Sequence, residues 1–102
     1  AVSTEPSTTD PAAIPTRFRL EPNRPNPFNP TTSISYSVPV FGPVRLAVHT
    51  LLGQTVEILT DGQHAPGRYT LEFDASALPS GSYFVRLQAG DQVLTRQMLL
   101  VK

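Results

Sequence analysis

The sequence predicts an all-β fold, a sandwich of two antiparallel sheets, on three observations. Short runs alternate between apolar and polar residues with a period of two, as strands do when only one of their faces is buried. Turn-forming residues separate these runs, so that a strand begins about every 10 to 14 residues. No stretch of the chain has the apolar periodicity of an amphipathic helix.

Seven runs fit this pattern, and in chain order they are residues 18–20, 32–38, 44–50, 55–60, 68–73, 82–89 and 92–101. The first is a candidate edge strand, and each of the others has an apolar face that we expect to point inward. This face comprises Ile34, Tyr36, Val38, Val44, Leu46, Val48, Val56, Ile58, Tyr69, Leu71, Phe73, Tyr83, Val85, Leu87, Leu94, Met98 and Leu100. Arg96 interrupts it in the last run. Seven strands are typical of an immunoglobulin-like sandwich, and this topology is predicted from the count alone because the chain has no Cys or Trp.

Residues that favour turns separate the runs from one another. They are Phe41-Gly42-Pro43, Leu52-Gly53, Asp61-Gly62, Pro66-Gly67, Pro79-Ser80-Gly81 and Gly90-Asp91. Tight turns need a residue that tolerates positive φ or one whose φ is fixed in advance, and Gly and Pro supply these. We therefore expect positive φ at Gly53, Gly67 and Gly81. Tyr83 follows such a turn and should bury its ring while its hydroxyl group makes a hydrogen bond.

The N-terminal stretch "AVSTEPSTTDPAAIPT" consists mainly of Ala, Ser, Thr and Pro. Such a segment cannot bury enough apolar surface to offset the entropy lost on ordering. We therefore expect a linker over residues 1–24 and one folded domain over residues 25–102, together forming the tail of a larger protein. The alternative is a disordered N-terminus of a small free protein.

The stretch "PNPFNPTT", residues 25–32, leads into the first long strand and is called the lead-in below. It cannot be a central strand, because three of its residues lack a backbone N–H group: Pro25, Pro27 and Pro30. The residue before each proline favours an extended conformation, so the lead-in should be stiff. We expect Asn26 and Asn29 to satisfy backbone groups where the ladder has not yet begun. Phe28 should enter the end of the core.

Composition excludes several classes of function. The chain has no cysteine, which excludes a disulfide framework, thiol catalysis and thiolate metal sites. The formal net charge is zero and the basic residues are scattered, so we expect no nucleic-acid partner. The longest apolar run, Met98 to Val101, is far shorter than the roughly 20 residues of a membrane-spanning helix. We expect neither a membrane span nor a signal peptide in these residues.

No catalytic motif is present, and we expect no enzyme activity and no cofactor. His49 and His64 lack a third metal ligand at suitable spacing and are interpreted as surface residues. The acidic residues of the strands and turns do not form a recognisable catalytic pair; they are Glu57, Asp61, Glu72, Asp74 and Asp91. Calcium binding by Asp61, Asp74 and Asp91 is an alternative to their role as turn formers.

Sugar binding is the main functional alternative, because many secreted carbohydrate-binding modules are β-sandwiches. Such modules usually stack sugar rings on exposed aromatic residues, most often Trp, which this chain lacks. Phe84 has the opposite phase from Tyr83 and lies beside Arg86 on the outward face. One aromatic residue beside an arginine is a weak platform for a sugar, and packing against a neighbouring strand or a partner is the other interpretation. A structural immunoglobulin-like spacer is a further alternative.

Residues 25–102 resemble the type A C-terminal sorting domains of proteins exported by the type IX secretion system of Bacteroidetes and their relatives. They are also similar to the immunoglobulin-like module of the flagellar hook-capping protein. The matching stretches are "PNPFNPTTSISYSVP", "VRLAVHTLLGQTVEILTDGQHAPGRYTLEFDA" and "LPSGSYFVRLQAGDQVLTRQMLLVK". The order and spacing of these pieces carry the resemblance, since none of them is diagnostic alone.

The resemblance assigns the family's motif to specific positions. These are Pro25, Asn26, Pro27, Phe28, Asn29, Pro30, Gly53, Gly67, Leu78, Gly81, Tyr83, Arg96 and Lys102. The last strand departs from the family pattern, because only Arg96 and Lys102 are basic where many members carry more lysine.

The resemblance implies that this domain is a secretion signal and a cell-surface attachment module of a larger exported protein. Proteins of this kind cross the inner membrane by a separate N-terminal signal, and the C-terminal domain then folds in the periplasm. Outer-membrane translocon components recognise it, and a sortase-like protease often removes it while the cargo is attached to a lipopolysaccharide. The implied partners are therefore the translocon, the protease and a covalently linked N-terminal cargo, expected to be an enzyme. Self-association through an exposed edge strand, the last one above all, is also expected.

Overall fold

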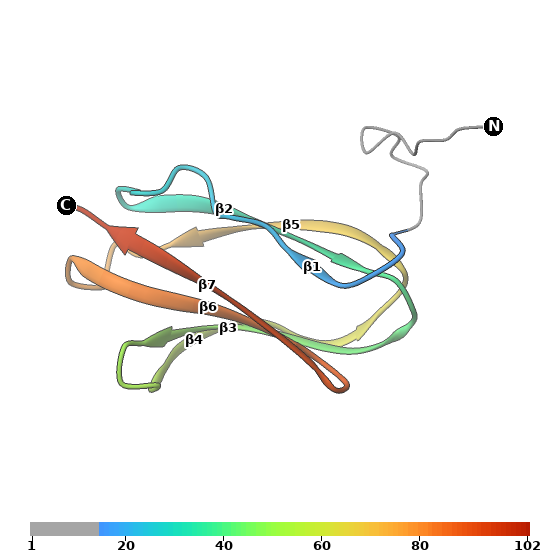
Figure 1. Cartoon of the computed structure of the whole chain (residues 1–102). Coiled ribbons are helices and arrows are strands. Elements are labelled where there is room, and N and C mark those ends of the chain that lie inside the picture. The colour runs from blue at the N-terminus through green and yellow to red at the C-terminus, as the bar shows by residue number, and fades with distance from the viewer. Residues whose placement is uncertain (1–14) are drawn as a thin grey trace.

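The computed structural model describes residues 15–102, which form two antiparallel sheets packed face to face (Figure 1). The strands are β1 (Arg19–Leu20), β2 (Thr31–Val38), β3 (Gly42–Thr50), β4 (Thr55–His64), β5 (Gly67–Asp74), β6 (Gly81–Ala89) and β7 (Gln92–Leu100). One sheet has the order β1-β2-β5 and the other β4-β3-β6-β7. The predicted all-β sandwich of seven strands is confirmed. Within the described range, no helix is long and apolar enough to cross a membrane.

The core lies between the two sheets and is built from the inward faces of the strands. The faces predicted for β2, β3 and β6 are buried as expected, and Ile34, Val48 and Val85 have no exposed surface at all. On β5, Phe73 is buried while Tyr69 and Leu71 pack against the core from its margin. On β7, Met98 and Leu100 are buried and Leu94 is half-buried. Alternation of period two therefore identified most of the core.

Strand β4 departs from the prediction in length and in phase. It continues to His64, so that Asp61-Gly62 is part of the strand and pairs with Arg45 and Val44 instead of forming a turn. The register of β4 against β3 shifts twice, between Leu46 and Ala47 and between Val48 and His49. Each shift inserts an unpaired residue and reverses which side chains point inward.

The consequence of these bulges is seen at Ile58. It was expected to share the inward face with Val56, but its side chain is 46% exposed. Leu59 packs against the core in its place, together with Val56. A count of every second residue fails here because two residues of β4 lie opposite one residue of β3 at each bulge.

Four glycines with positive φ lie in or beside the turns that connect the strands. Gly53 has a φ of 88° in the loop between β3 and β4, and Gly90 has a φ of 58° in the hairpin between β6 and β7. Both angles lie in the left-handed region that favours glycine. Gly67 and Gly81 begin β5 and β6 with φ angles of 158° and 150°, which residues with a side chain rarely adopt. The expected positive φ is present at all three predicted glycines.

The folded part of the chain includes residues that precede the lead-in. Strand β1 pairs with β2 through Arg19–Ser37 and Leu20–Tyr36, which confirms the short edge strand predicted at residues 18–20. Leu20 is 4% exposed and belongs to the core. Residues 18–24, which lie within the expected linker, thus pack on the sandwich. Of the linker residues before them, 1–14 lie outside the described range.

Candidate recognition surface

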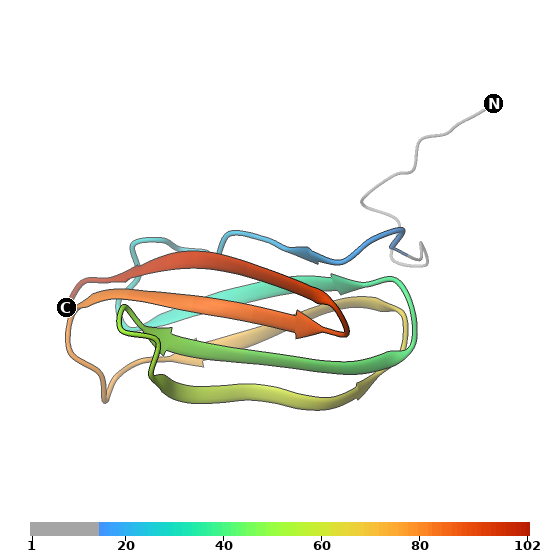
Figure 2. The ribbon, with the colours of Figure 1, turned by 60° about the horizontal axis from the view of Figure 1, so that its bottom comes forward.

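The lead-in lies against the last strand of the sandwich. The N–H group of Phe28 donates to the carbonyl oxygen of Leu99 at 2.9 Å, and the N–H group of Val101 donates to the carbonyl oxygen of Phe28 at 3.0 Å. These bonds form a parallel bridge between Phe28 and Leu100. Figure 2 shows the lead-in (light blue) running beside β7 (red). We call the contact of Asn26 and Phe28 with residues 97–102 the terminal seam.

Asn26 extends the seam with its side chain. Its Nδ2 atom donates to the carbonyl oxygen of Gln97 at 3.2 Å, and its Oδ1 atom accepts from the N–H group of Leu99 at 3.0 Å. Because β7 is the outermost strand of its sheet, these backbone groups have no neighbouring strand to bond. The amide of Asn26 takes the place of that strand, as expected from its position. Asn29 is exposed.

Phe28 anchors the seam in the core. Its side chain is 2% exposed, and its ring centroid lies 6.2 Å from that of Phe73 in a tilted arrangement. Aromatic pairs of this separation contribute beyond the burial of their surface. The prediction that Phe28 enters the end of the core is confirmed, and this burial fixes where the lead-in meets β7.

Asn23 holds the start of the lead-in, a role that the sequence did not reveal. It is 2% exposed, and its Nδ2 atom donates to the carbonyl oxygen of Pro25 at 3.1 Å and to Oγ1 of Thr32 at 3.0 Å. The hydroxyl group of Thr32 in turn donates to the carbonyl oxygen of Pro25 at 2.9 Å. Thr32 lies two residues before the inward-pointing Ile34, so the alternation of the strand predicts that its side chain points inward as well. This was the one sequence feature that indicated a buried polar group at this place.

Lys102 fastens the other side of the seam to the loop between β5 and β6. Its N–H group donates to Oγ of Ser80 at 3.0 Å, and its Nζ atom donates to the carbonyl oxygen of Ser76 at 2.7 Å. Ser76 also bonds to Asp74 through its backbone N–H and its hydroxyl group. These bonds, with a smaller contribution from Lys102, hold the pKa of Asp74 below its usual value.

Asp74 therefore acts as a turn former, which is the role that was weighed against calcium binding. Within residues 15–102, no group of three His, Asp or Glu side chains could hold a metal ion.

Tyr83 supports the same loop from inside. Its ring is 5% exposed, and its hydroxyl group donates to the carbonyl oxygen of Pro79 at 2.6 Å. A tyrosine near the start of a strand that bonds to the backbone a few residues upstream is the tyrosine corner of immunoglobulin-like sandwiches. Leu78 packs against the core and Gly81 begins β6. The motif residues 78, 81 and 83 thus shape the loop to which Lys102 is bonded.

Arg96 links the two sheets on the side of β7 away from the seam. Its Nε atom donates to the carbonyl oxygen of Leu20 at 2.8 Å. The bond joins β7 to β1, the edge strand of the other sheet. Arg96 interrupts the apolar face of β7 because at this position the strand meets the backbone of β1.

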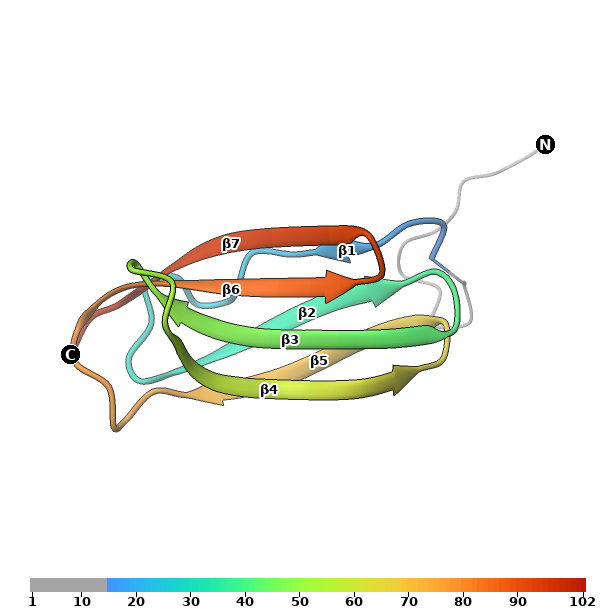
Figure 3. The same ribbon diagram turned by 90° about the horizontal axis from the view of Figure 1, so that it is seen from below.

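Two motif residues lie away from the seam. The loop that contains Gly53 lies at the same end of the sandwich as the C-terminus, whereas the connection before Gly67 lies at the opposite end (Figure 3). The lead-in and the last strand are therefore brought together, and Gly53 and Gly67 serve separate turns.

His64 is not a surface residue, contrary to the prediction. It is buried, with Nε2 2.8 Å from the hydroxyl oxygen of Tyr36 and Nδ1 3.1 Å from the carbonyl oxygen of Gly62. Because the carbonyl oxygen of Gly62 can only accept, Nδ1 carries the proton and the hydroxyl group of Tyr36 donates to Nε2. The prediction was wrong because it ended β4 before His64, whereas the strand continues and turns this side chain inward.

This contact connects the two sheets at the end remote from the seam. The ring of Tyr69 stacks on that of Tyr36 at 5.3 Å and meets that of His64 edge-on at 4.8 Å. Burial, followed by the neighbouring Tyr69, raises the pKa of Tyr36 to about 12. His49, in contrast, lies outward as predicted, and its Nδ1 atom is 3.2 Å from the hydroxyl group of Thr55.

Phe84 and Arg86 point outward from the four-stranded sheet, as their phase predicted. Both are half-buried, and they line a shallow hollow of about 210 Å³ together with His49 and Leu51. Phe84 thus packs among neighbouring strands, in line with the second of the two interpretations weighed for it.

Comparison with known families accounts for these observations. Residues 24–102 match the family described as the secretion system C-terminal sorting domain. A search of the curated proteins found no match. The matched range contains both sides of the terminal seam and every strand except β1. The chain belongs to the family of C-terminal sorting domains of the type IX secretion system.

Proposed function

We propose that the terminal seam is the surface by which the type IX secretion machinery recognises this domain. A domain of this family is a sorting signal, and the protein that carries it is exported. The observation that carries the proposal is the bonding of Asn26 to Leu99 across 73 positions of the chain. Asn26 and Phe28 of the lead-in and residues 97–102 thereby form one continuous surface. An outer-membrane translocon component is the proposed partner for this surface.

The domain also serves, in this proposal, to attach the exported protein to the cell surface. The cargo is an N-terminal domain joined through a linker that precedes Phe18, and we expect it to be an enzyme. The fold limits where a sortase-like protease could cut this linker. Leu20 and Asn23 are buried, and Arg24 exchanges two backbone hydrogen bonds with Ser33. We therefore place the cleavage before Phe18, after the protein has crossed the periplasm and reached the outer membrane.

An export assay tests the proposal. A signal peptide and a fluorescent reporter are fused to residues 1–102 and expressed in a bacterium that has the type IX system. The reporter should reach the surface or the medium, and its final mass should show a cut before residue 18. Removal of residues 92–102 should leave it in the periplasm.

A point substitution separates recognition from folding. Asn26→Ala removes the amide from the seam, and Asn29→Ala is the matched control because Asn29 is exposed outside it. We expect Asn26→Ala to reduce export while the purified domain stays folded by circular dichroism, and Asn29→Ala to be exported normally. Normal export of a folded Asn26→Ala protein would contradict the role of the seam.

A further inference from the structure

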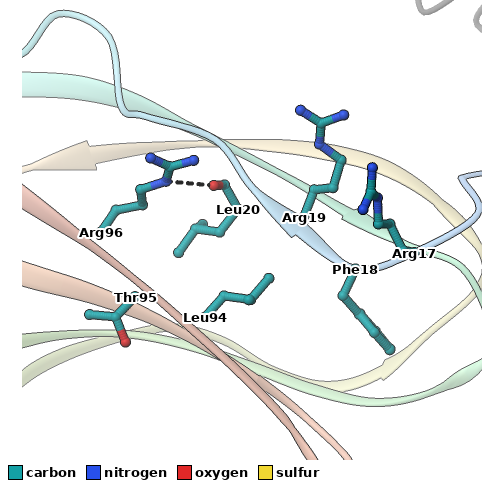
Figure 4. A pocket seen from close by; sticks show the side chains of 7 residues that line it. All are labelled: Arg17, Phe18, Arg19, Leu20, Leu94, Thr95 and Arg96. Carbon is teal, nitrogen blue, oxygen red and sulfur yellow. Dashed lines mark hydrogen bonds between the residues drawn. The ribbon is translucent and has the colours of Figure 1, made fainter.

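We propose that a groove between β1 and β7 binds the phosphate group of a phosphate monoester. The groove has a volume of about 360 Å³, within the range of pockets that accept small ligands. Three arginines line it, Arg17 and Arg19 from the β1 segment and Arg96 from β7 (Figure 4). No Asp or Glu from the described residues lines it. The groove is separate from the terminal seam, which lies at the other end of β7.

The arginine side chains leave their charged ends open to a ligand. In Figure 4 the guanidinium groups of Arg17 and Arg19 lie on the side away from the ring of Phe18. Arg96 uses only Nε to bond Leu20, so its two terminal nitrogen atoms make no hydrogen bond within the described residues. Three arginines line the groove and none of the described lining residues is acidic, so the groove has a positive potential that attracts anions.

The nearest carboxylate along the chain does not neutralise this charge. Glu21 forms an ion pair with Arg68, and their side-chain atoms are 2.9 Å apart. In that pair a single arginine binds one carboxylate. Three arginines instead match a group with more charge and more acceptor oxygens.

A phosphate monoester fits this description. It carries close to two negative charges at neutral pH and has three strong acceptor oxygens. Phe18, Leu20 and Leu94 also line the groove and give it an apolar part. This apolar part suits the carbon skeleton to which the phosphate is esterified. Since β1 and β7 belong to different sheets, the ligand would join the sheets beside the bond between Arg96 and Leu20.

Binding is tested with phenyl phosphate, which has a phosphate monoester on a small apolar body. Calorimetric titration of residues 1–102 at low ionic strength should give saturable binding, and the ligand should raise the melting temperature because it binds only the folded chain. Arg19→Gln should weaken binding about tenfold through the loss of a charge-assisted contact. Arg24→Gln, which removes an exposed arginine outside the groove, should leave the affinity within about twofold.

Vesicles distinguish a membrane source from a soluble one. Phosphatidylcholine vesicles are prepared with phosphatidic acid, a phosphate monoester, or with phosphatidylglycerol, a phosphodiester. Preference for phosphatidic acid identifies a lipid ligand, whereas binding of phenyl phosphate without vesicle binding identifies a soluble ester. Three results would overturn the proposal: no saturable binding of either monoester, equal binding to both kinds of vesicle, or equal loss in the Arg19→Gln and Arg24→Gln proteins.

Discussion

The side-chain oxygen of Asn26 accepts a hydrogen bond from the backbone N–H group of Leu99 at 3.0 Å, although the two residues are 73 positions apart. Together with the second bond, from the amide nitrogen to Gln97, this makes one asparagine side chain the lateral partner of an edge strand. The lead-in is thus a structural part of the four-stranded sheet. Self-pairing of β7, expected from its place at the edge, would have to use the half that the lead-in leaves open.

Asn26→Ala should lower the free energy of unfolding by about 1–2 kcal/mol, because two partly solvated hydrogen bonds are lost. Urea denaturation followed by circular dichroism measures the change. Asn29→Ala should shift the same transition by less than about 0.5 kcal/mol, since Asn29 is exposed. Equal effects of the two substitutions would mean that the bonds of Asn26 do not stabilise the seam.

Phe28→Ala should lower the free energy of unfolding by about 3–5 kcal/mol, because it leaves a cavity where the ring meets Phe73. The matched control is Phe41→Ala in the loop between β2 and β3, where the side chain is 67% exposed. We expect the control to change stability by less than about 0.5 kcal/mol. A small effect of Phe28→Ala in thermal and urea unfolding would show that the lead-in does not anchor itself through this ring.

Tyr83→Phe should lower the free energy of unfolding by about 1–2 kcal/mol, because the carbonyl oxygen of Pro79 loses its partner in a partly buried position. Tyr69→Phe provides the comparison, since the hydroxyl group of Tyr69 makes a bond of the same length to Ala65 in an exposed position. The Tyr69 substitution should have the smaller effect. The reverse order in differential scanning calorimetry would argue against a supporting role for the tyrosine corner.

The buried hydroxyl group of Tyr36 should make stability depend on alkaline pH. Its pKa is raised from 10.0 to about 12 in the folded chain, so between these values the unfolded chain loses the proton first. The stability contributed by the protonated hydroxyl is therefore complete below pH 10 and is lost as the pH rises toward 12. Urea midpoints measured across this range should fall, and Tyr36→Phe should flatten the fall. An equally steep fall in the variant would assign the effect to other groups.

The sequence predicted most of the sandwich because burial of one sheet face leaves a direct trace in the alternation of residues. It failed on β4, where bulges opposite Ala47 and His49 reverse the phase and bring Leu59 inward in place of Ile58. A bulge depends on the partner strand, and residues 55–64 alone do not encode it. The error at His64 has the same origin, since its burial follows from the length of β4.

The candidate surface was predictable in part. The shortage of N–H groups in the lead-in and the isolation of Phe28 indicated a segment that docks at the end of the core. The strand against which the lead-in docks could not be identified from the sequence, because the hydrogen bond between residues 26 and 99 depends on the complete topology. The role of Asn23 could not be predicted for a similar reason, since its partners Pro25 and Thr32 come within hydrogen-bond distance only after the chain has turned.

The bridge between Phe28 and Leu100 also determines when, during synthesis of the chain, the seam can form. A chain made from its N-terminus has the lead-in early, but the strand that receives it is the last of the sandwich to be synthesised. The seam therefore cannot form until the ribosome has added Val101, whose N–H group closes the bridge. A protein whose synthesis stops earlier carries the proline-rich motif without a folded signal. Export that depends on the seam would consequently select chains that contain the whole sandwich and leave behind those that lack its last strand.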